Sequence, residues 1–161
     1  MNIEKMIEKI NKVFEETSYN DNKILAHANI DTGALFCVNP YMMYHLYDQS
    51  ILTARINENE SGKKSLMRVW SDALKNNTPG EATPGTLYGK KMIRIYNGIW
   101  SAYIDKKFTK GFPKNTVYYS DDPQHGVIAA IIEKDKIYRF ALIMPIHVHD
   151  GREFIPDGAT V

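Results

Sequence analysis

The sequence predicts a single α+β domain in which about three helices cover one face of an antiparallel sheet of about five to seven strands. Three observations favour this class. Apolar residues recur at helical spacing in the N-terminal half, strand-like runs separated by turn residues fill the C-terminal half, and a length of 161 residues suits one hydrophobic core. We therefore expect residues 1–161 to form one domain.

Three stretches of the N-terminal half are interpreted as helices. Apolar residues within 3–14 lie three or four positions apart, as on one face of an amphipathic helix. Asn39-Pro40 matches a helix cap followed by proline, so 40–56 is expected to be helical. Residues 66–74 repeat the amphipathic spacing and predict the third helix.

Turn chemistry predicts the hairpins. Residues 24–30 and 34–39 read as two strands joined by the loop Asp31-Thr32-Gly33, in which glycine takes a positive φ. Residues 127–133 and 137–146 form a second hairpin across Lys134-Asp135. Both faces of this second hairpin are largely apolar, which predicts a central place in the sheet. Residues 116–120 read as a further short strand.

A repeated triplet marks the expected flexible segment. Thr78-Pro79-Gly80 recurs as Thr83-Pro84-Gly85. Proline and glycine are the strongest markers of turns, so a flexible loop is expected around 77–86.

Asn97-Gly98 gives the strongest hairpin signal. As a two-residue loop it pairs Tyr96 with Ile99 and Ile95 with Trp100. One face then carries Ile93, Ile95, Trp100, Ala102 and Ile104. The other carries Met92, Arg94, Tyr96, Ile99, Ser101 and Tyr103. This sorting predicts that Trp100 and Ile95 are buried and that Arg94 and Tyr103 lie on the opposite face.

Composition restricts the class of protein. The formal charge is +1, which excludes a uniformly basic nucleic-acid coat, and the single cysteine, Cys37, excludes an internal disulfide. The first residues resemble an amphipathic helix rather than a signal peptide. The longest apolar runs, 127–132 and 140–146, fall short of the roughly 20 residues that cross a bilayer. We expect a soluble cytoplasmic protein without a membrane partner.

Charge is distributed unevenly along the chain. Residues 86–119 hold seven basic side chains and one acidic one, a net charge of +6. The same segment holds 8 of the 18 aromatic residues. Rings interleaved with cations on a sheet suit stacked bases and their phosphates, because any base stacks on a ring while lysine and arginine attract phosphate.

The sequence therefore predicts a non-catalytic binding module for a nucleotide or nucleic acid. The expected ligand-binding residues are Arg94, Tyr96, Tyr103, Lys106, Lys107 and Lys110. Aromatic residues with arginine are also enriched at protein interfaces, so a protein-interaction or self-assembly role for the Tyr96/Tyr103 face is an alternative. The composition of this segment also has an explanation without any ligand. Aromatic residues are favoured in strands because they pack well, and lysines at sheet edges deter aggregation.

A second alternative is a metal-dependent enzyme. His147 and His149 stand two positions apart, so on a strand they point to the same face and can share a metal, with Glu153 as an oxygen ligand. The spacing is similar to the His-x-His-x3-Glu portion of metal-binding barrels of the cupin type. That resemblance implies a metal site at His147, His149 and Glu153. A strand that ends in polar residues and a glycine turn has the same sequence.

Asp31-Thr32-Gly33-Ala34 is similar to the Asp-Thr-Gly-Ala segment of retroviral-type aspartic proteases. That resemblance implies a dimer in which two such carboxylates share one proton and activate water. The hairpin-turn interpretation of the same residues needs no further assumption. No Gly-rich phosphate-binding loop of the Walker or dinucleotide type occurs in the sequence, and no residue pattern names a catalysed reaction or a cofactor.

Overall fold

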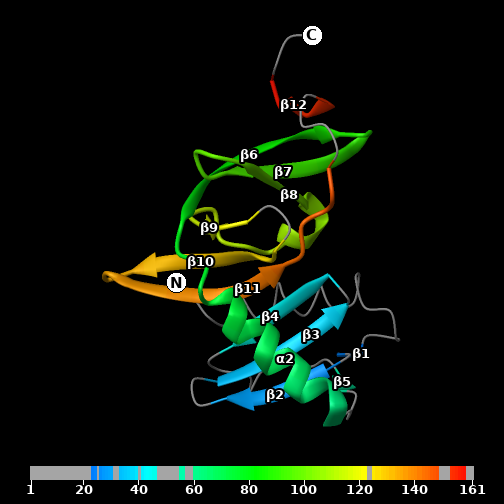
Figure 1. Ribbon diagram of the computed structural model, residues 1–161, viewed down its shortest axis with the longest axis vertical. Helices are drawn as coiled ribbons and strands as arrows, with labels where there is room; N and C mark the ends of the chain where they lie inside the picture. The colour runs from blue at the N-terminus through cyan, green and yellow to red at the C-terminus, as the bar shows by residue number, and fades with distance from the viewer. Residues whose placement is uncertain are drawn as a thin grey trace.

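The structure is a computed structural model (Figure 1) that describes residues 23–24, 26–30, 33–39, 41–46, 55–56, 60–122, 125–148 and 153–158. Its strands are β1 (Lys23–Ile24), β2 (Ala26–Ile30), β3 (Gly33–Asn39), β4 (Met42–Leu46), β5 (Arg55–Ile56), β6 (Pro79–Leu87), β7 (Lys90–Tyr96), β8 (Ser101–Asp105), β9 (Val117–Tyr119), β10 (Val127–Glu133), β11 (Lys136–Ile143) and β12 (Ile155–Pro156). Its helices are α2 (Glu60–Ala73) and the 3-10 helix η1 (Lys106–Thr109).

Ten of these strands form one antiparallel sheet that curls on itself. Its order is β2-β3-β4-β11-β10-β9-β6-β7-β8, and β12 pairs with β6 beside this path. Ile146, three residues after β11, forms an isolated bridge with Tyr103 of β8, and its backbone N–H donates to the Tyr103 carbonyl at 2.8 Å. The path from β11 through β8 therefore returns to the chain beyond β11, as in a partly closed barrel. β1 and β5 pair in parallel as a separate two-stranded sheet.

The main core lies on the inner side of this curl. It joins residues of β3 and β4 to residues of β7, β8, β10 and β11. Its largest fully buried side chains are Phe36, Tyr44, Leu46, Ile95, Ile104 and Phe140. Burial of each large apolar side chain contributes roughly 1.5–3 kcal/mol, so this cluster fixes the relative positions of the two halves of the sheet.

Helix α2 covers part of the opposite face. Leu66, Trp70 and Ala73 are four and three residues apart, so they form one stripe of the helix, and all three are buried. The stripe belongs to a second core cluster with residues of β2, β3, β4, β9, β10 and β11. Figure 1 shows α2 lying across β2, β3 and β4. This helix is too short and too polar to cross a membrane, and no other described helix could.

The predicted fold class is wrong in its helices and in the size of its sheet. The described residues hold one α-helix instead of about three, and the sheet has ten strands instead of about five to seven. The protein is mostly antiparallel β-structure. The helix expected at 66–74 is present as α2, whereas the helix expected at 3–14 lies outside the described residues.

The helix expected over 40–56 is contradicted by β4 and β5. Met42–Leu46 is a strand paired with both β3 and β11, and all five of its side chains are buried. One face of β4 contacts the inner core and the other lies in the cluster under α2. A strand covered on both faces shows no alternation of apolar and polar residues, so its sequence resembles that of a buried helix segment.

The loop expected around 77–86 is mostly strand β6. Residues from Pro79 onward pair first with β9 and then with β7. Proline lacks an N–H and is confined to strand edges and ladder positions where none is needed, which is why the repeated Pro-Gly pairs suggested turns. The Lys134-Asp135 hairpin is confirmed, since Glu133 pairs with Lys136 around it. The hairpin of β2 and β3 is confirmed too, and Gly33 has a φ of 142°.

Candidate functional site

The β7–β8 hairpin has the predicted faces with a different register. Tyr96 pairs with Ser101 and Arg94 with Tyr103, two positions away from the predicted pairing. Asn97 causes the longer loop, because its side-chain Oδ1 accepts hydrogen bonds from the backbone N–H groups of residues 99 and 100, each at 3.0 Å. Side chains alternate along a strand with a period of two, so a slip of two leaves each strand residue on its predicted face.

Burial follows this sorting at most positions. Ile93, Ile95, Ala102 and Ile104 are buried in the inner core. Trp100 was expected to be buried opposite Ile95, but it lies in the loop and is half-buried.

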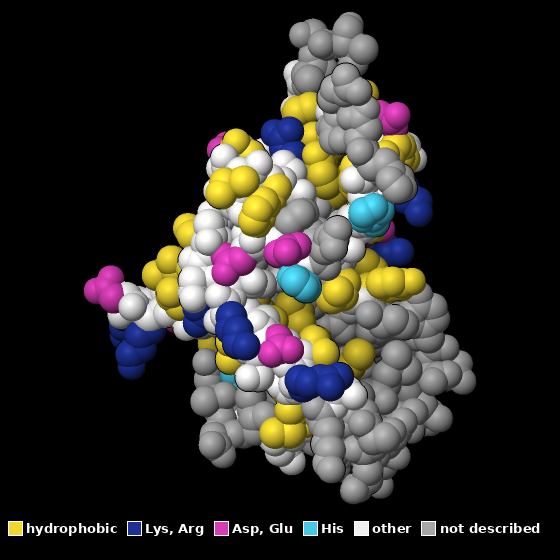
Figure 2. All heavy atoms as spheres, viewed as in Figure 1, with side chains coloured by type: hydrophobic (Ala, Val, Ile, Leu, Met, Phe, Trp, Pro, Cys, Tyr) yellow, Lys and Arg dark blue, Asp and Glu magenta, His cyan; other side chains and the backbone are white. Residues whose placement is uncertain are grey.

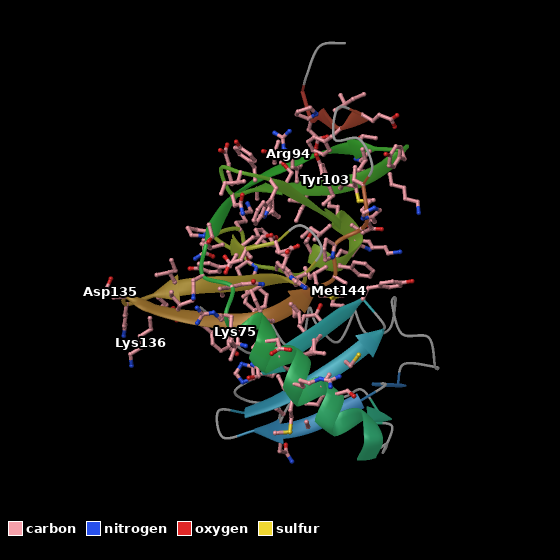
Figure 3. All side chains as sticks on the ribbon, in the orientation of Figure 1. Lys75, Arg94, Tyr103, Asp135, Lys136 and Met144 are labelled. Atoms are coloured by element: carbon pink, nitrogen blue, oxygen red, sulfur yellow. The ribbon has the colours of Figure 1, made fainter. Side chains whose placement is uncertain are left out.

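The opposite face of the hairpin is covered by the protein itself. Tyr103 is only 6% exposed, and its ring lies 5.5 Å from the ring of Phe154, centroid to centroid. The guanidinium carbon of Arg94 lies 5.0 Å from the same Phe154 centroid. Figure 3 shows Arg94 and Tyr103 on the part of the sheet that lies next to β12. The two residues expected to stack a ligand ring therefore contact a phenyl ring of the chain.

Phe154 belongs to the C-terminal strap, which we define as residues 153–158. Ile155 pairs with Thr86, Pro156 pairs with Gly85, and the Asp157 N–H donates to the Pro84 carbonyl at 3.0 Å. Gly85 makes room for the ring, since a Cβ there would overlap Phe154 and lie 2.5 Å from the Ile155 carbonyl oxygen. We call Gly85, Arg94 and Tyr103 the ring notch.

Tyr96, the third expected stacking residue, lies apart from the ring notch. It is 44% exposed at the end of β7, and its hydroxyl donates to the Gly98 carbonyl at 3.1 Å. Ile99 in the adjoining loop is 79% exposed. A protein-interaction role for this end of the hairpin stays a prediction.

The expected lysines do come together. A cavity of about 660 Å³, which we call the lysine pocket, is lined by Lys90, Lys91, Asp105, Lys106, Lys107, Thr109 and Lys110. Its residues come from the start of β7, the end of β8 and the 3-10 helix η1. Among the described residues that line this cavity, five are lysines and one is a carboxylate, so these residues together carry a positive charge.

Asp105, which lines the pocket, has a structural role. Asp105 accepts a hydrogen bond from the Lys107 backbone N–H at 3.0 Å, which caps η1, and it lies 3.7 Å from the Lys107 ammonium. The Lys107 ammonium also lies 5.1 Å from the centroid of the Phe108 ring. Phe108 is buried in the inner core, so it holds η1 against the sheet. The short helix and its lysines are thereby positioned by packing rather than by a ligand.

The sequence identified three lysines of this pocket and missed two. Lys106, Lys107 and Lys110 were expected site residues, whereas Lys90 and Lys91 counted only toward the charge of the segment. The β7–β8 pairing of Met92 with Asp105 brings the start of one strand beside the end of the other. The predicted pairing, two positions away, also places Lys91 beside the end of β8, so the missing signal was the position of η1, which Phe108 fixes by packing in the inner core.

The metal hypothesis is not tested by the described residues. His147 and Glu153 are both exposed, and His149 lies outside the described part of the chain. Within the residues that the structure describes, no group of three histidine, cysteine, aspartate or glutamate side chains could hold a metal ion. Asp31 and Thr32 of the protease-like segment are also outside the described residues. Both interpretations stay predictions.

A second cavity, of about 510 Å³, opens between α2 and the start of β10. It is lined by Val69, Asp72, Ala73, Lys75, Asn76, Asp121, Asp122, His125, Gly126, Leu142 and Met144. Figure 2 shows acidic and histidine side chains beside hydrophobic ones in the middle of this face, and Figure 3 labels Lys75 and Met144 there.

Polar groups of this second cavity interact with neighbouring groups of the protein. The Asp121 carboxylate accepts hydrogen bonds from the backbone N–H groups of Asn77 and Thr78, and His125 lies 3.5 Å from Asp122. Partial burial raises the pKa of Asp121, but these donors outweigh it and hold the pKa below its usual value. Asp121 thus anchors the segment between α2 and β6 to the segment that follows β9.

No family model, curated protein or solved structure matches this chain.

Proposed function

We propose that the protein is a non-catalytic binding module that takes a phosphate-bearing ligand into the lysine pocket. The observation that carries this proposal is the convergence of five lysines, from the start of β7, from η1 and from the residue after η1, on one cavity whose described lining residues include one carboxylate. Lysine ammonium groups attract phosphate as point charges, and like charges gathered in a concave surface reinforce one another.

The lysine pocket favours phosphate over a planar carboxylate ligand. Arginine, which binds carboxylates in a two-pronged geometry, is not among the described residues that line it. Several lysines around one cavity suit an anion with several charges, such as a chain of phosphates. A small ligand of this kind fits a cavity of about 660 Å³.

Calorimetric titration with inorganic tripolyphosphate tests the proposal. We expect binding at low ionic strength that weakens as salt is added, because salt screens partly exposed charges over about 10 Å at 0.1 M. Lys106→Gln and Lys90→Gln should each weaken binding about fivefold, the upper range for an exposed ion pair. Lys114→Gln is the matched control, since Lys114 lies in the same basic segment but does not line the pocket.

The contrary result is equally clear. If tripolyphosphate does not bind at low salt, where attraction is greatest, the pocket does not bind phosphate. If the Lys114 variant loses as much affinity as the Lys106 variant, only the diffuse charge of the segment attracts anions, and the pocket has no special role.

A further inference from the structure

The ring notch and the lysine pocket lie along the same strand pair, β7 and β8, and two of the pocket residues, Lys90 and Asp105, lie on the face of that pair that carries the notch. Lys90, Met92 and Arg94 alternate along β7, so their side chains point to its outer side. Across the strand pair, Arg94 faces Tyr103 and Met92 faces Asp105, which lines the pocket. Lys90 and Arg94 are four positions apart along the strand, a span of about 13 Å. That span is comparable with the distance from the base to the last phosphate of a nucleoside triphosphate.

The ring notch already holds an aromatic ring, over which the Arg94 guanidinium lies and to which the Tyr103 ring is tilted at 59°. Phe154 contacts the Arg94 guanidinium on one side and the Tyr103 ring on another, and it seats against Gly85. Guanidinium and aromatic groups are the common partners of stacked bases. The buried cluster here is small and separate from the inner core, with Leu87, Met92, Tyr103 and Phe154 as its buried members.

Arg94 has a hydrogen-bond donor that Phe154 cannot satisfy. Its Nε is buried and has no hydrogen-bond partner among the described residues. A buried donor without an acceptor is uncommon in folded proteins and calls for an explanation. A phenyl ring offers no conventional acceptor, whereas a base or a phosphate offers several, so a nucleotide satisfies this donor better than Phe154 does.

The strap that carries Phe154 pairs with the sheet through a short strand. Strand β12 has two residues, and one of them, Pro156, has no N–H to donate. Short peripheral segments with few hydrogen bonds open locally at far lower cost than the whole fold. The strap can therefore leave the notch while the barrel stays folded.

We propose that the ring notch is the base subsite of a nucleotide-binding site whose phosphate subsite is the lysine pocket, and that Phe154 occupies the base subsite as an internal competitor. This proposal rests on the proposed function for its phosphate subsite. Nucleotide binding displaces the strap, whereas a phosphate chain without a base leaves it in place. The strap thus weakens the binding of nucleotides, which must displace Phe154, but not the binding of polyphosphate without a base.

Titration of the full chain with three probes separates the two subsites. Adenosine tests the notch, tripolyphosphate tests the pocket, and adenosine triphosphate tests both. In Phe154→Ala we expect adenosine to bind, adenosine triphosphate to bind at least about tenfold more tightly than to wild type, a difference of about 1.4 kcal/mol, and tripolyphosphate to bind as before. Ile155→Ala is the control, since Ile155 lies in the same strap and is 45% exposed.

The outcomes distinguish the proposals. If Phe154→Ala, shown by circular dichroism to be folded, gains no affinity for adenosine, the base subsite does not exist, whatever tripolyphosphate does. If adenosine binds this variant but tripolyphosphate binds no form of the protein, the notch stands and the proposed function of the pocket fails. Phe154→Leu keeps an apolar side chain without the ring, and should show a smaller gain if the alanine variant does not fold.

Hydrogen exchange in wild type gives a measurement that needs no variant. The Asp157 N–H is bonded to the Pro84 carbonyl while the strap is in place. Saturating adenosine triphosphate should speed exchange of this amide, and tripolyphosphate should not. Equal protection with both ligands would overturn the proposal.

Discussion

The guanidinium carbon of Arg94 lies 5.0 Å from the centre of the Phe154 ring, which places a cation over an aromatic face between strand β7 and the C-terminal strap. Such pairs contribute about 0.5–1 kcal/mol when partly exposed. The ring also packs with Tyr103, Met92 and Leu87, so the pair is one part of a small apolar cluster. Phe154 therefore connects the strap to the sheet through both charge and packing.

A double-mutant cycle measures this connection. Phe154→Ala should lower the free energy of unfolding by about 2 kcal/mol, the value for losing a buried phenyl group at the edge of a fold. Arg94→Ala should cost less, and the double variant should reveal a coupling of about 0.5–1 kcal/mol. Denaturant unfolding supplies the measurement. Arg139, which lies over Tyr119, is the control, and Arg139→Ala should show no coupling to Phe154.

A substitution at Gly85 gives an independent test of how closely the Phe154 ring packs against β6. A Cβ at position 85 overlaps Phe154 and the Ile155 carbonyl, so Gly85→Ala should destabilise the protein by about 1–3 kcal/mol. In the Phe154→Ala background most of this cost should disappear, because the strap is no longer anchored. Equal costs in the two backgrounds, measured by denaturant unfolding, would show that another neighbour of Gly85 is responsible.

The hairpins could be predicted because their signals are local. Lys134-Asp135 and the faces of β7 and β8 depend on residues close in sequence. The β7–β8 register was predicted two positions away from the observed one. A shift by an even number of positions leaves each strand residue on its predicted face, so the prediction of the faces was unaffected. The lysine pocket could not be predicted in the same way, because it also depends on how η1 packs against the sheet through Phe108.

Long-range contacts explain the other failures. Met42–Leu46 is buried by β3, by β11 and by residues of two core clusters. Most of these neighbours are distant in sequence, so the segment's own residues did not indicate them. Gly85 was read as a turn residue, whereas the structure shows close approach of Phe154, which is distant in sequence. The basic aromatic face was predicted to stack a ligand ring, and that prediction stays untested. Its observed ring comes from the strap, which no pattern in residues 86–119 could indicate.

The turn between β10 and β11 carries measurable strain. Lys134 and Asp135 have φ values of 49° and 63°, a conformation that costs residues with a Cβ about 1 kcal/mol each. Asp135→Gly should raise the free energy of unfolding by about 0.5–1 kcal/mol, because glycine accepts this φ without strain. Figure 3 shows Asp135 and Lys136 at the tip of the projecting hairpin, away from the core.

The neighbouring residue is the matched control. Lys136 is equally exposed but belongs to β11, where glycine has no conformational advantage and lowers stability by about 0.5–1 kcal/mol. Lys136→Gly should therefore change the midpoint of denaturant unfolding in the opposite direction. If both glycines destabilise the protein, strain in the turn does not limit its stability.

Buried tyrosines predict how stability changes in alkali. Tyr118 lies in the inner core, and burial raises its pKa to about 12. Burial also raises the pKa of Tyr44, which is fully buried. A tyrosine of the unfolded chain loses its proton near pH 10. Ionisation therefore favours the unfolded chain above that pH, and stability that is fully present below pH 10 is lost as the pH rises toward 12.

Replacing the ionisable ring separates this effect from general alkaline damage. Tyr118→Phe keeps the ring and removes the proton, so its free energy of unfolding should fall less steeply between pH 10 and 12, by on the order of 2 kcal/mol over the interval. Tyr44→Phe should act in the same direction, and the double variant should be flatter than either. Denaturant unfolding at a series of pH values gives the slopes. Parallel losses in wild type and Tyr118→Phe would mean that Tyr118 ionises as readily in the folded protein as in the unfolded chain, which its burial against Ala129 and the inner core opposes.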